Sequence, residues 1–477
     1  MPRGGSARGP GSPGGRGDPG GPAESRGRGD SGVPGEFRGL GEPRYSGDRR
    51  GPGQPCVPAG SERRGDPDAA RARLVDELRD SGRLTSRAVE AAFRAVPRHV
   101  FLPEMAATEV YQDEAFVIKT GDDGMPVSSS SQPAIMAIML EQLGLARGNR
   151  VLEIGAGTGY NAALMAFLVG ERGSVVTVDI DADLAARARA KLVAAGYARV
   201  LVICGDGGFG APDHAPFDRI IVTAGAWDLA PDWLAQLGPG GRIVLPLSVR
   251  GIQLCVALER EAGHWRSRSA CRCGFIRMAG AFAGPESFVP LGPQPGLHVQ
   301  ADEGRPVDPD ALYGALNGPT TDVPAGVQVT GLGELGEADL WLMVTEPDLV
   351  RLTVTGSGPL RGSQLPLLPF GAMADSGTLT GPGGPGVAAL LPVRPRPGRG
   401  YGEFEVAVRG FGPRGAGLAG HLAARVLAWD ERGRPGASGL RLSAYPQGTP
   451  EEALPGQVIL DRRHTRLALS WPSSSPS

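Results

Sequence analysis

The sequence predicts an α/β protein with a parallel, doubly wound sheet, followed by a smaller α+β domain. Three observations lead to this fold class. A glycine-rich turn joins an apolar strand to a helix near residue 155, strands and helices alternate from 150 to 248, and the pattern changes after about 292. Alternating strands and helices bury their apolar faces best in a parallel sheet with helices on both faces.

The first structured segment is expected at 67–103, where the apolar spacing is helical. Ser81-Gly82 breaks this segment into two helices and Pro97 stops the second one. Further along, helices are expected over 160–170 and 182–196, and strands over 150–155, 174–180, 200–207, 217–225 and 241–248.

Residues 1–68 are rich in Gly, Pro and Arg and are expected to form a disordered tail, because they contain few large apolar residues. An Arg/Gly tract can bind RNA, but interleaved Asp and Glu favour a solvated tail. The formal net charge of −2 gives no reason to expect nucleic acid or a membrane surface as a partner. With no long apolar run and no signal peptide, the protein is expected to be cytoplasmic.

The C-terminal part has a different pattern. Residues 293–330 are expected to be a linker, and 331–477 an α+β domain. In that domain a helix is expected over 415–433, and strands over 338–345, 349–356, 401–410, 440–446 and 466–472.

The glycine turn predicts a ligand that contains adenosine. Its spacing is GxGxG. The dinucleotide fingerprint GxGxxG would place its third glycine at position 160, where this chain has Tyr160, so a pyrophosphate is disfavoured. Asp179 ends the next strand, 24 residues after Gly155, where a carboxylate can accept hydrogen bonds from ribose hydroxyls. Asp206 ends a third strand, where it can bind an adenine edge. Adenosine without phosphate indicates S-adenosylmethionine, and the alternative is a purely structural turn. The candidate cofactor residues are Glu153, Ile154, Gly155, Gly157, Gly159, Tyr160, Asp179, Ile180, Asp206, Gly207 and Thr223.

Several motifs resemble the protein-L-isoaspartate O-methyltransferase family over about residues 69–292. They are "YQDEAFVI", "SSQPAIMAIMLEQLGLARGNRVLEIGAGTGYNAALMA", "GDGGFGAPDHAPFDRIIVTAGAWDLAPDWLAQLGPGGRIVLPL" and "FVPL". The resemblance implies a Rossmann-like, class I S-adenosylmethionine-dependent methyltransferase domain at 69–292.

The family's Thr-Ile-Ser-X-Pro segment corresponds to "SSSQP" here. Its serine, which in the family lies beside the substrate carboxylate, falls on Ser131 and is the expected catalytic residue. Ser128, Ser129 and Ser130 are expected to bind the substrate. The structural alternative for Ser131 is the N-cap of the following helix.

Methylation of a carboxylate requires no general base from the protein, because a carboxyl group with a pKa near 4 is already ionised at neutral pH. Lys119 could bind this carboxylate or could be a solvated surface residue. Cys271, Cys273 and His264 invite a zinc interpretation, but the C-x-C spacing is a poor match and no metal is expected.

The expected partner is a peptide or protein that carries aspartate or isoaspartate. The chain continues for about 185 residues beyond "FVPL". This extension resembles an actinobacterial branch associated with lanthipeptide or ATP-grasp peptide tailoring, which would imply esterification of aspartate and formation of a succinimide. The alternative is a housekeeping repair enzyme whose C-terminal half is a separate binding module. If the C-terminal domain recognises a precursor peptide, deletion from residue 293 should abolish methylation and leave cofactor binding intact.

Overall fold

The structure is a computed structural model that describes residues 66–122, 125–293, 297–301, 307–354, 371–374, 386–393 and 404–472. The disorder expected for 1–68 lies outside these residues, except at 66–68, where the first helix begins. Asp66 caps this helix by accepting a hydrogen bond from the Asp68 amide, and Pro67 occupies its first turn.

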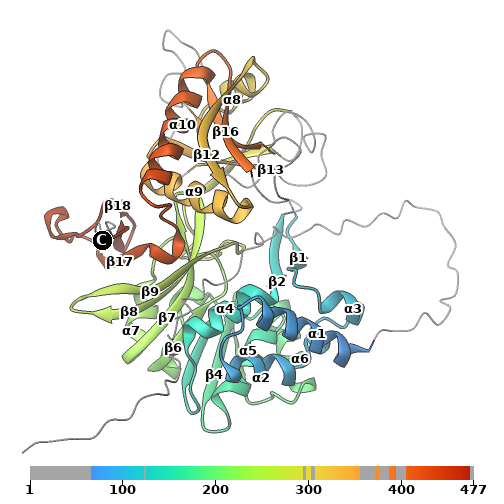
Figure 1. Ribbon diagram of the computed structural model, residues 1–477. Helices are drawn as coiled ribbons and strands as arrows, with labels where there is room; N and C mark the ends of the chain where they lie inside the picture. Colours follow the sequence, from blue (N-terminus) through green and yellow to red (C-terminus); the bar gives the residue numbers. More distant parts are fainter. Residues whose placement is uncertain are drawn as a thin grey trace, which may run out of the picture. The chain divides into compact units, whose positions relative to one another are not determined.

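The described residues contain a ten-stranded sheet in the order β18-β19-β17-β9-β8-β7-β6-β3-β4-β5. Several of its strands, from β17 to β4, are labelled in Figure 1. Five of its strands, β7, β6, β3, β4 and β5, pair in parallel, as the alternating pattern predicted. The other five are antiparallel additions at one edge. The strands are β3 (Arg150–Ile154), β4 (Ser174–Asp179), β5 (Leu201–Cys204), β6 (Phe217–Val222), β7 (Leu237–Val249), β8 (Ile252–Glu261), β9 (His264–Cys273), β17 (Arg441–Pro446), β18 (Val458–Asp461) and β19 (Thr465–Ser470).

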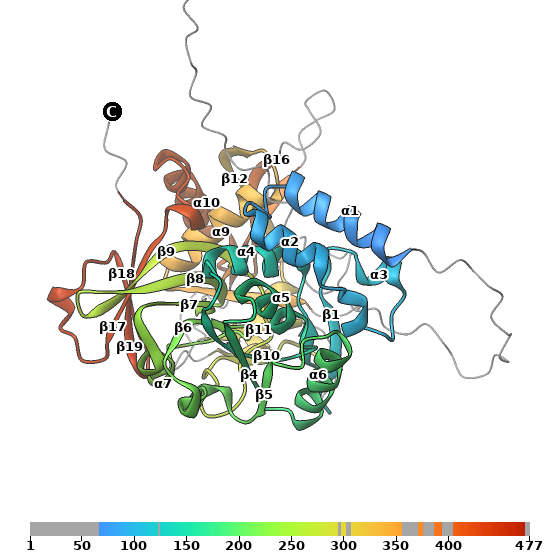
Figure 2. The ribbon, with the colours of Figure 1, turned by 90° about the horizontal axis from the view of Figure 1, so that it is seen from below.

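Alternate residues of the parallel strands enter two different hydrophobic clusters. Val151 and Val175 pack with helices α1, α2, α4, α5 and α6, which gather on one face (Figure 2). Leu152 and Val176 pack with α7 and with elements of the C-terminal part. The expected helices on both faces are therefore unevenly divided. These helices are α1 (Pro67–Asp80), α2 (Arg87–Ala95), α3 (Ala107–Val110), α4 (Pro133–Leu143), α5 (Tyr160–Val169), α6 (Ala182–Ala194) and α7 (Pro231–Gln236).

Short elements complete this part of the chain. The strands β1 (Phe116–Thr120) and β2 (Pro126–Ser130) form a separate antiparallel hairpin that carries the serine segment. The 3₁₀ helices are η1 (Arg98–Phe101), η2 (Gly207–Phe209), η3 (Pro212–His214), η4 (Ala437–Gly439) and η5 (Glu451–Ala453).

The C-terminal part contains a second sheet in the order β10-β11-β13-β14-β15-β16-β12. Helix α10 lies across β12 and β16 (Figure 1). The strands are β10 (Ser287–Pro290), β11 (Leu297–Ala301), β12 (Thr320–Val329), β13 (Leu349–Val354), β14 (Gly371–Ala374), β15 (Val387–Val393) and β16 (Phe404–Phe411), and the helices are α8 (Pro309–Leu316), α9 (Leu332–Thr345) and α10 (Gly415–Glu431).

Three expectations about this part were wrong. Residues 293–330 are not a plain linker, because they contain β11, α8 and β12. The strand expected at 338–345 is the second half of helix α9, since an apolar run that is buried on all sides suits either structure. The residues 441–470 do not belong to the second sheet; they extend the first one through β17, which pairs with β9.

No helix among the described residues is long and apolar enough to cross a membrane.

Candidate active site

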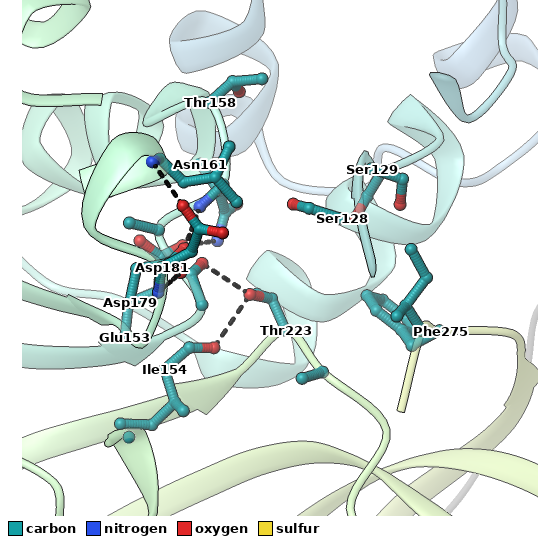
Figure 3. Close-up of a pocket in the computed structure, with 18 of the residues that line it drawn as sticks. Ser128, Ser129, Glu153, Ile154, Thr158, Asn161, Asp179, Asp181, Thr223 and Phe275 are labelled. Atoms are coloured by element: carbon teal, nitrogen blue, oxygen red, sulfur yellow. Dashed lines mark hydrogen bonds between the residues drawn. The ribbon is translucent and has the colours of Figure 1, made fainter. Parts of the chain in front are cut away.

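A cavity of about 360 Å³ opens at the carboxyl ends of β3, β4 and β6 (Figure 3). Two walls face each other across it. We call the glycine turn and the strand ends around it the strand-end wall, and residues 127–131 the serine wall. A third stretch, residues 275–279, also lines the cavity. Ligands of parallel α/β sheets bind at this edge of the sheet.

The glycine turn has a backbone that only glycine tolerates well. Gly155 has a φ of +100°, and a Cβ placed on it would lie 2.6 Å from the Thr223 hydroxyl oxygen. That hydroxyl lies 2.8 Å from the Gly155 carbonyl and 3.0 Å from that of Ile154, so it fixes the turn against the end of β6. Gly157 has a φ of +52°, and a Cβ added there would lie 3.7 Å from the Ser129 carbonyl oxygen, so the glycine turn and the serine wall come close together at this point.

Asp179 joins this turn to the end of β4. One carboxylate oxygen accepts a hydrogen bond from the Gly157 amide at 2.9 Å, and the other accepts one from the Asp181 amide at 3.0 Å. Each oxygen keeps a second lone pair. Because Asp179 lines the cavity, these lone pairs are available to a ligand, and the ribose contact remains a prediction.

Glu153 lies fully buried at the base of the strand-end wall. Its carboxyl group accepts hydrogen bonds from the Thr177 hydroxyl at 2.6 Å and from the Asn161 amide at 2.8 Å. Burial raises the pKa of Glu153 to about 7, although these two hydrogen bonds lower it. Asn161 lines the cavity, and its amide oxygen is buried and has no hydrogen-bond partner among the described residues.

Arg98 anchors the serine wall through hydrogen bonds. This fully buried guanidinium donates to the Ser130 hydroxyl at 3.3 Å and to the Ser131 carbonyl at 2.9 Å, and it also binds the Val110 carbonyl at 3.0 Å. Burial lowers the pKa of Arg98 to about 10, so the group remains charged at neutral pH. The side chain of Ser128, two residues before Ser130, points into the cavity (Figure 3).

Ser131 does not cap helix α4. The N-cap of this helix is Gln132, and the free amide of Ala134 is bound by the Asp113 carboxylate at 2.8 Å. Asp113 also accepts a hydrogen bond from the Gln132 side chain. The helix therefore begins without using the Ser131 hydroxyl, and Ser131 lines the cavity with Ser128, Ser129 and Ser130.

Two predicted cofactor residues lie outside the lining. Asp206 accepts hydrogen bonds from the amides of Gly208 at 2.9 Å and Ala281 at 2.7 Å, so its carboxylate is held by protein backbone. Gly159 lies where helices α5 and α6 approach each other, and an added Cβ would lie 3.3 Å from the Ala188 carbonyl oxygen. Its neighbour Tyr160 and the other predicted residues, Glu153, Ile154, Gly155, Gly157, Asp179, Ile180, Gly207 and Thr223, line the cavity.

The chain is similar to known proteins over residues 69–282. Residues 69–282 match the family model of protein-L-isoaspartate(D-aspartate) O-methyltransferase. A protein-L-isoaspartate O-methyltransferase of Methanopyrus kandleri is 42% identical over 222 residues, which is 46% of this chain and 96% of that protein. A second relative, protein-L-isoaspartate O-methyltransferase 2 of Archaeoglobus fulgidus, is 40% identical over 217 residues and is also covered to 96%. This chain belongs to the protein-L-isoaspartate O-methyltransferase family.

The family assignment makes the chain an S-adenosylmethionine-dependent carboxyl O-methyltransferase. A solved protein-L-isoaspartate O-methyltransferase has 24% identity and a TM-score of 0.43, over 78% of this chain and 96% of that chain. The family match ends at residue 282, so the second sheet and strands β17–β19 lie beyond it.

Several lining residues of the methyltransferase were missed by sequence reasoning. Asn161 and Thr158 flank the start of helix α5, where the polar residues next to the glycine turn were the available signal. No such signal marked residues 275–279, which follow β9 and reach the cavity through long-range contacts. Lys119 lies outside the cavity lining and pairs with Asp181, Nζ to Oδ2, at 2.5 Å. Its side chain is 31% exposed, so it is a surface lysine held in an ion pair.

Proposed function

We propose that this methyltransferase esterifies the α-carboxylate of L-isoaspartyl residues in damaged proteins and peptides. The observation that carries the proposal is the serine wall, which faces the glycine turn across one cavity in a chain that covers 96% of a relative with this named activity. The role in peptide tailoring finds no support in the two relatives named above, both of which are isoaspartate methyltransferases by name.

The donor set of the strand-end wall fits S-adenosylmethionine. Asp179 would bind the ribose hydroxyls, and the unpartnered oxygen of Asn161 would accept a hydrogen bond from the ammonium group. Ile180 is apolar yet about half exposed (49%) at the cavity, where it would pack against the adenine ring. When bound, the cofactor supplies an electrophilic methyl group on a sulfonium sulfur.

The serine wall would hold the acceptor. The acceptor carboxylate is ionised at neutral pH, so the protein has to orient one oxygen toward the methyl carbon and exclude water. Hydroxyl groups suit this task because they bind the carboxylate without neutralising its charge. Ser131 would provide the main contact, with Ser128 and Ser129 on the same strand end, while Arg98 keeps Ser130 and the wall in place.

Glu153 would have a positioning role. It is buried beneath the glycine turn and its pKa of about 7 comes from burial. Its hydrogen bond orients the Asn161 amide, which leaves the amide oxygen free for the ligand. Proton transfer is not required by the reaction, so this raised pKa has no catalytic duty to perform.

The proposal is tested with two short peptides that have the same sequence and differ only in an L-aspartyl or L-isoaspartyl linkage. Each is incubated with the full chain and S-adenosylmethionine and followed by intact-mass spectrometry. We expect one added methyl group on the isoaspartyl peptide only. Methylation of the aspartyl peptide alone would overturn the proposal and favour a tailoring enzyme.

A further inference from the structure

The turn between β18 and β19, residues 461–465, contacts the methyltransferase beside the cavity although it lies about 180 residues beyond the end of the family match. We propose that this C-terminal turn positions the segment 275–281, of which residues 275–279 line the cavity, and thereby sets the affinity of the protein for its cofactor. The proposal concerns cofactor binding, so it does not depend on which carboxylate is methylated.

The first contact joins the turn to the loop after β6. Asp228 is buried (8% exposed), and its carboxylate accepts hydrogen bonds from the His464 amide and the Thr465 hydroxyl, each at 2.6 Å. Four residues earlier, the same loop contains Ala224, which lines the cavity directly after Thr223. The C-terminal turn thus supplies two of the three hydrogen bonds that the Asp228 carboxylate accepts from described residues, and the third comes from the amide of Leu229.

The second contact joins the turn to the segment that follows β9. Arg463 donates to the Ala281 carbonyl at 3.3 Å, and the His464 ring lies 5.5 Å from the Phe282 ring, centroid to centroid. Phe282 in turn packs against Trp233 of α7. The turn therefore contacts the methyltransferase in two places, at the loop after β6 and at the segment after β9.

The segment 275–281 runs between two strand-end loops. Gly225, after β6, exchanges backbone hydrogen bonds with Ile276 and Met278, and Asp206, after β5, binds the Ala281 amide. In the sheet, β3 and β4 lie between β6 and β5. The segment therefore spans the strands that carry the glycine turn and Asp179, and its position decides the size of the cofactor cavity.

These contacts oppose the expectation that deletion from residue 293 leaves cofactor binding intact. Such a deletion would remove both hydrogen bonds to Asp228 and the contact to Ala281. It would also uncover the edge of β9, which pairs with β17.

The test uses full-length variants and calorimetric titration with S-adenosylhomocysteine, the product form of the cofactor. Thr465→Val removes the hydroxyl bound to Asp228 at almost constant volume, and we expect about tenfold weaker binding because a hydrogen bond to a charged group is lost. Thr465→Ser keeps the hydroxyl and should restore wild-type affinity. Thr449→Val is the matched control, since the Thr449 hydroxyl binds the Pro446 carbonyl away from the cavity.

Arg463→Met provides a second test that does not disturb a buried group. It removes the hydrogen bond to Ala281 from an exposed side chain, so the variant should fold normally and bind S-adenosylhomocysteine about threefold more weakly. Hydrogen exchange should become faster at the amides of 276–281. Wild-type affinity and exchange in Arg463→Met, or in a folded Thr465→Val, would overturn the proposal.

Discussion

The strand-end wall and the serine wall face each other across the cavity, and they are held in opposite ways (Figure 3). In the strand-end wall the partners lie on adjacent parallel strands or directly after them, as Thr177 with Glu153 and Asp179 with Gly157 of the glycine turn. The serine wall depends on a buried cation from another element, since Arg98 of η1 reaches across to Ser130 and Ser131. The difference suggests a division of labour, in which the first wall binds the cofactor and the second places the acceptor.

The largest expected effect concerns the buried base of the strand-end wall. The pKa of Glu153 is about 7 in the folded protein against an ordinary value of 4.5, so the folded state retains a proton that the unfolded chain releases. Its contribution to the free energy of unfolding is fully present below pH 4.5 and is lost as pH rises through 7. We expect the stability of the wild type relative to Glu153→Gln to fall by about 3 kcal/mol over this range.

Chemical denaturation of both proteins at pH 5 and pH 8 measures this difference. An equal stability gap at the two pH values would mean that Glu153 is ionised in the folded protein, and the burial argument for this carboxyl would fail.

Asp179 sharpens the comparison from the cofactor side. Asp179→Ala removes the proposed acceptor for the ribose and the anchor of the Gly157 amide, so S-adenosylhomocysteine should bind about a hundredfold more weakly in calorimetry. Asp183→Asn is the control, because the Asp183 side chain is 82% exposed and lies outside the cavity lining. Unchanged affinity in Asp179→Ala would remove the strand-end wall from the cofactor site.

Arg98 provides the reverse case. Lysine cannot reproduce the fork that binds Ser130, Ser131 and Val110, so Arg98→Lys should lower kcat/KM for an isoaspartyl peptide about thirtyfold. Affinity for S-adenosylhomocysteine should stay within about twofold of wild type. Arg94→Lys, at the ion pair with Asp76, serves as the control. Equal losses in cofactor binding and in kcat/KM would break the division between the walls.

Ser131 has the smallest expected effect. Loss of one neutral hydroxyl that orients the acceptor should reduce kcat/KM for the isoaspartyl peptide about tenfold in Ser131→Ala, with no change in cofactor affinity. Ser174→Ala, at the exposed start of β4, is the matched control. If Ser131→Ala retains full kcat/KM, the acceptor is held by other residues of the serine wall.

The contrast between the walls also explains which site residues could be predicted from the sequence. The glycine turn, Asp179 and the parallel strands could be predicted from local sequence patterns, because each lies within or directly after a short apolar run that is typical of a strand. Arg98 gives no comparable signal, since nothing near Pro97 indicates that its guanidinium is buried against residues more than thirty positions later. Asp206 was predicted at the correct strand end, but the sequence gives no indication that its carboxylate accepts a hydrogen bond from the Ala281 amide.

The C-terminal part shows the same limit on a larger scale. Its strands β13, β16, β17 and β19 were predicted as strands, but their division between two sheets was not. Sheet membership is decided by pairing between distant strands, such as Ala444 of β17 with Trp265 of β9, and periodicity within one strand carries no information about its partner.

The most direct test of the central claim is a one-pot competition between the aspartyl and isoaspartyl peptides, one of them carrying an isotopic label, with limiting full-length protein and S-adenosylmethionine. Mass spectrometry at early times then reports both products from the same sample. We expect the methyl ester to accumulate on the isoaspartyl peptide and to be absent from the aspartyl peptide. Preferential methylation of the aspartyl peptide would contradict the proposed repair of isoaspartate.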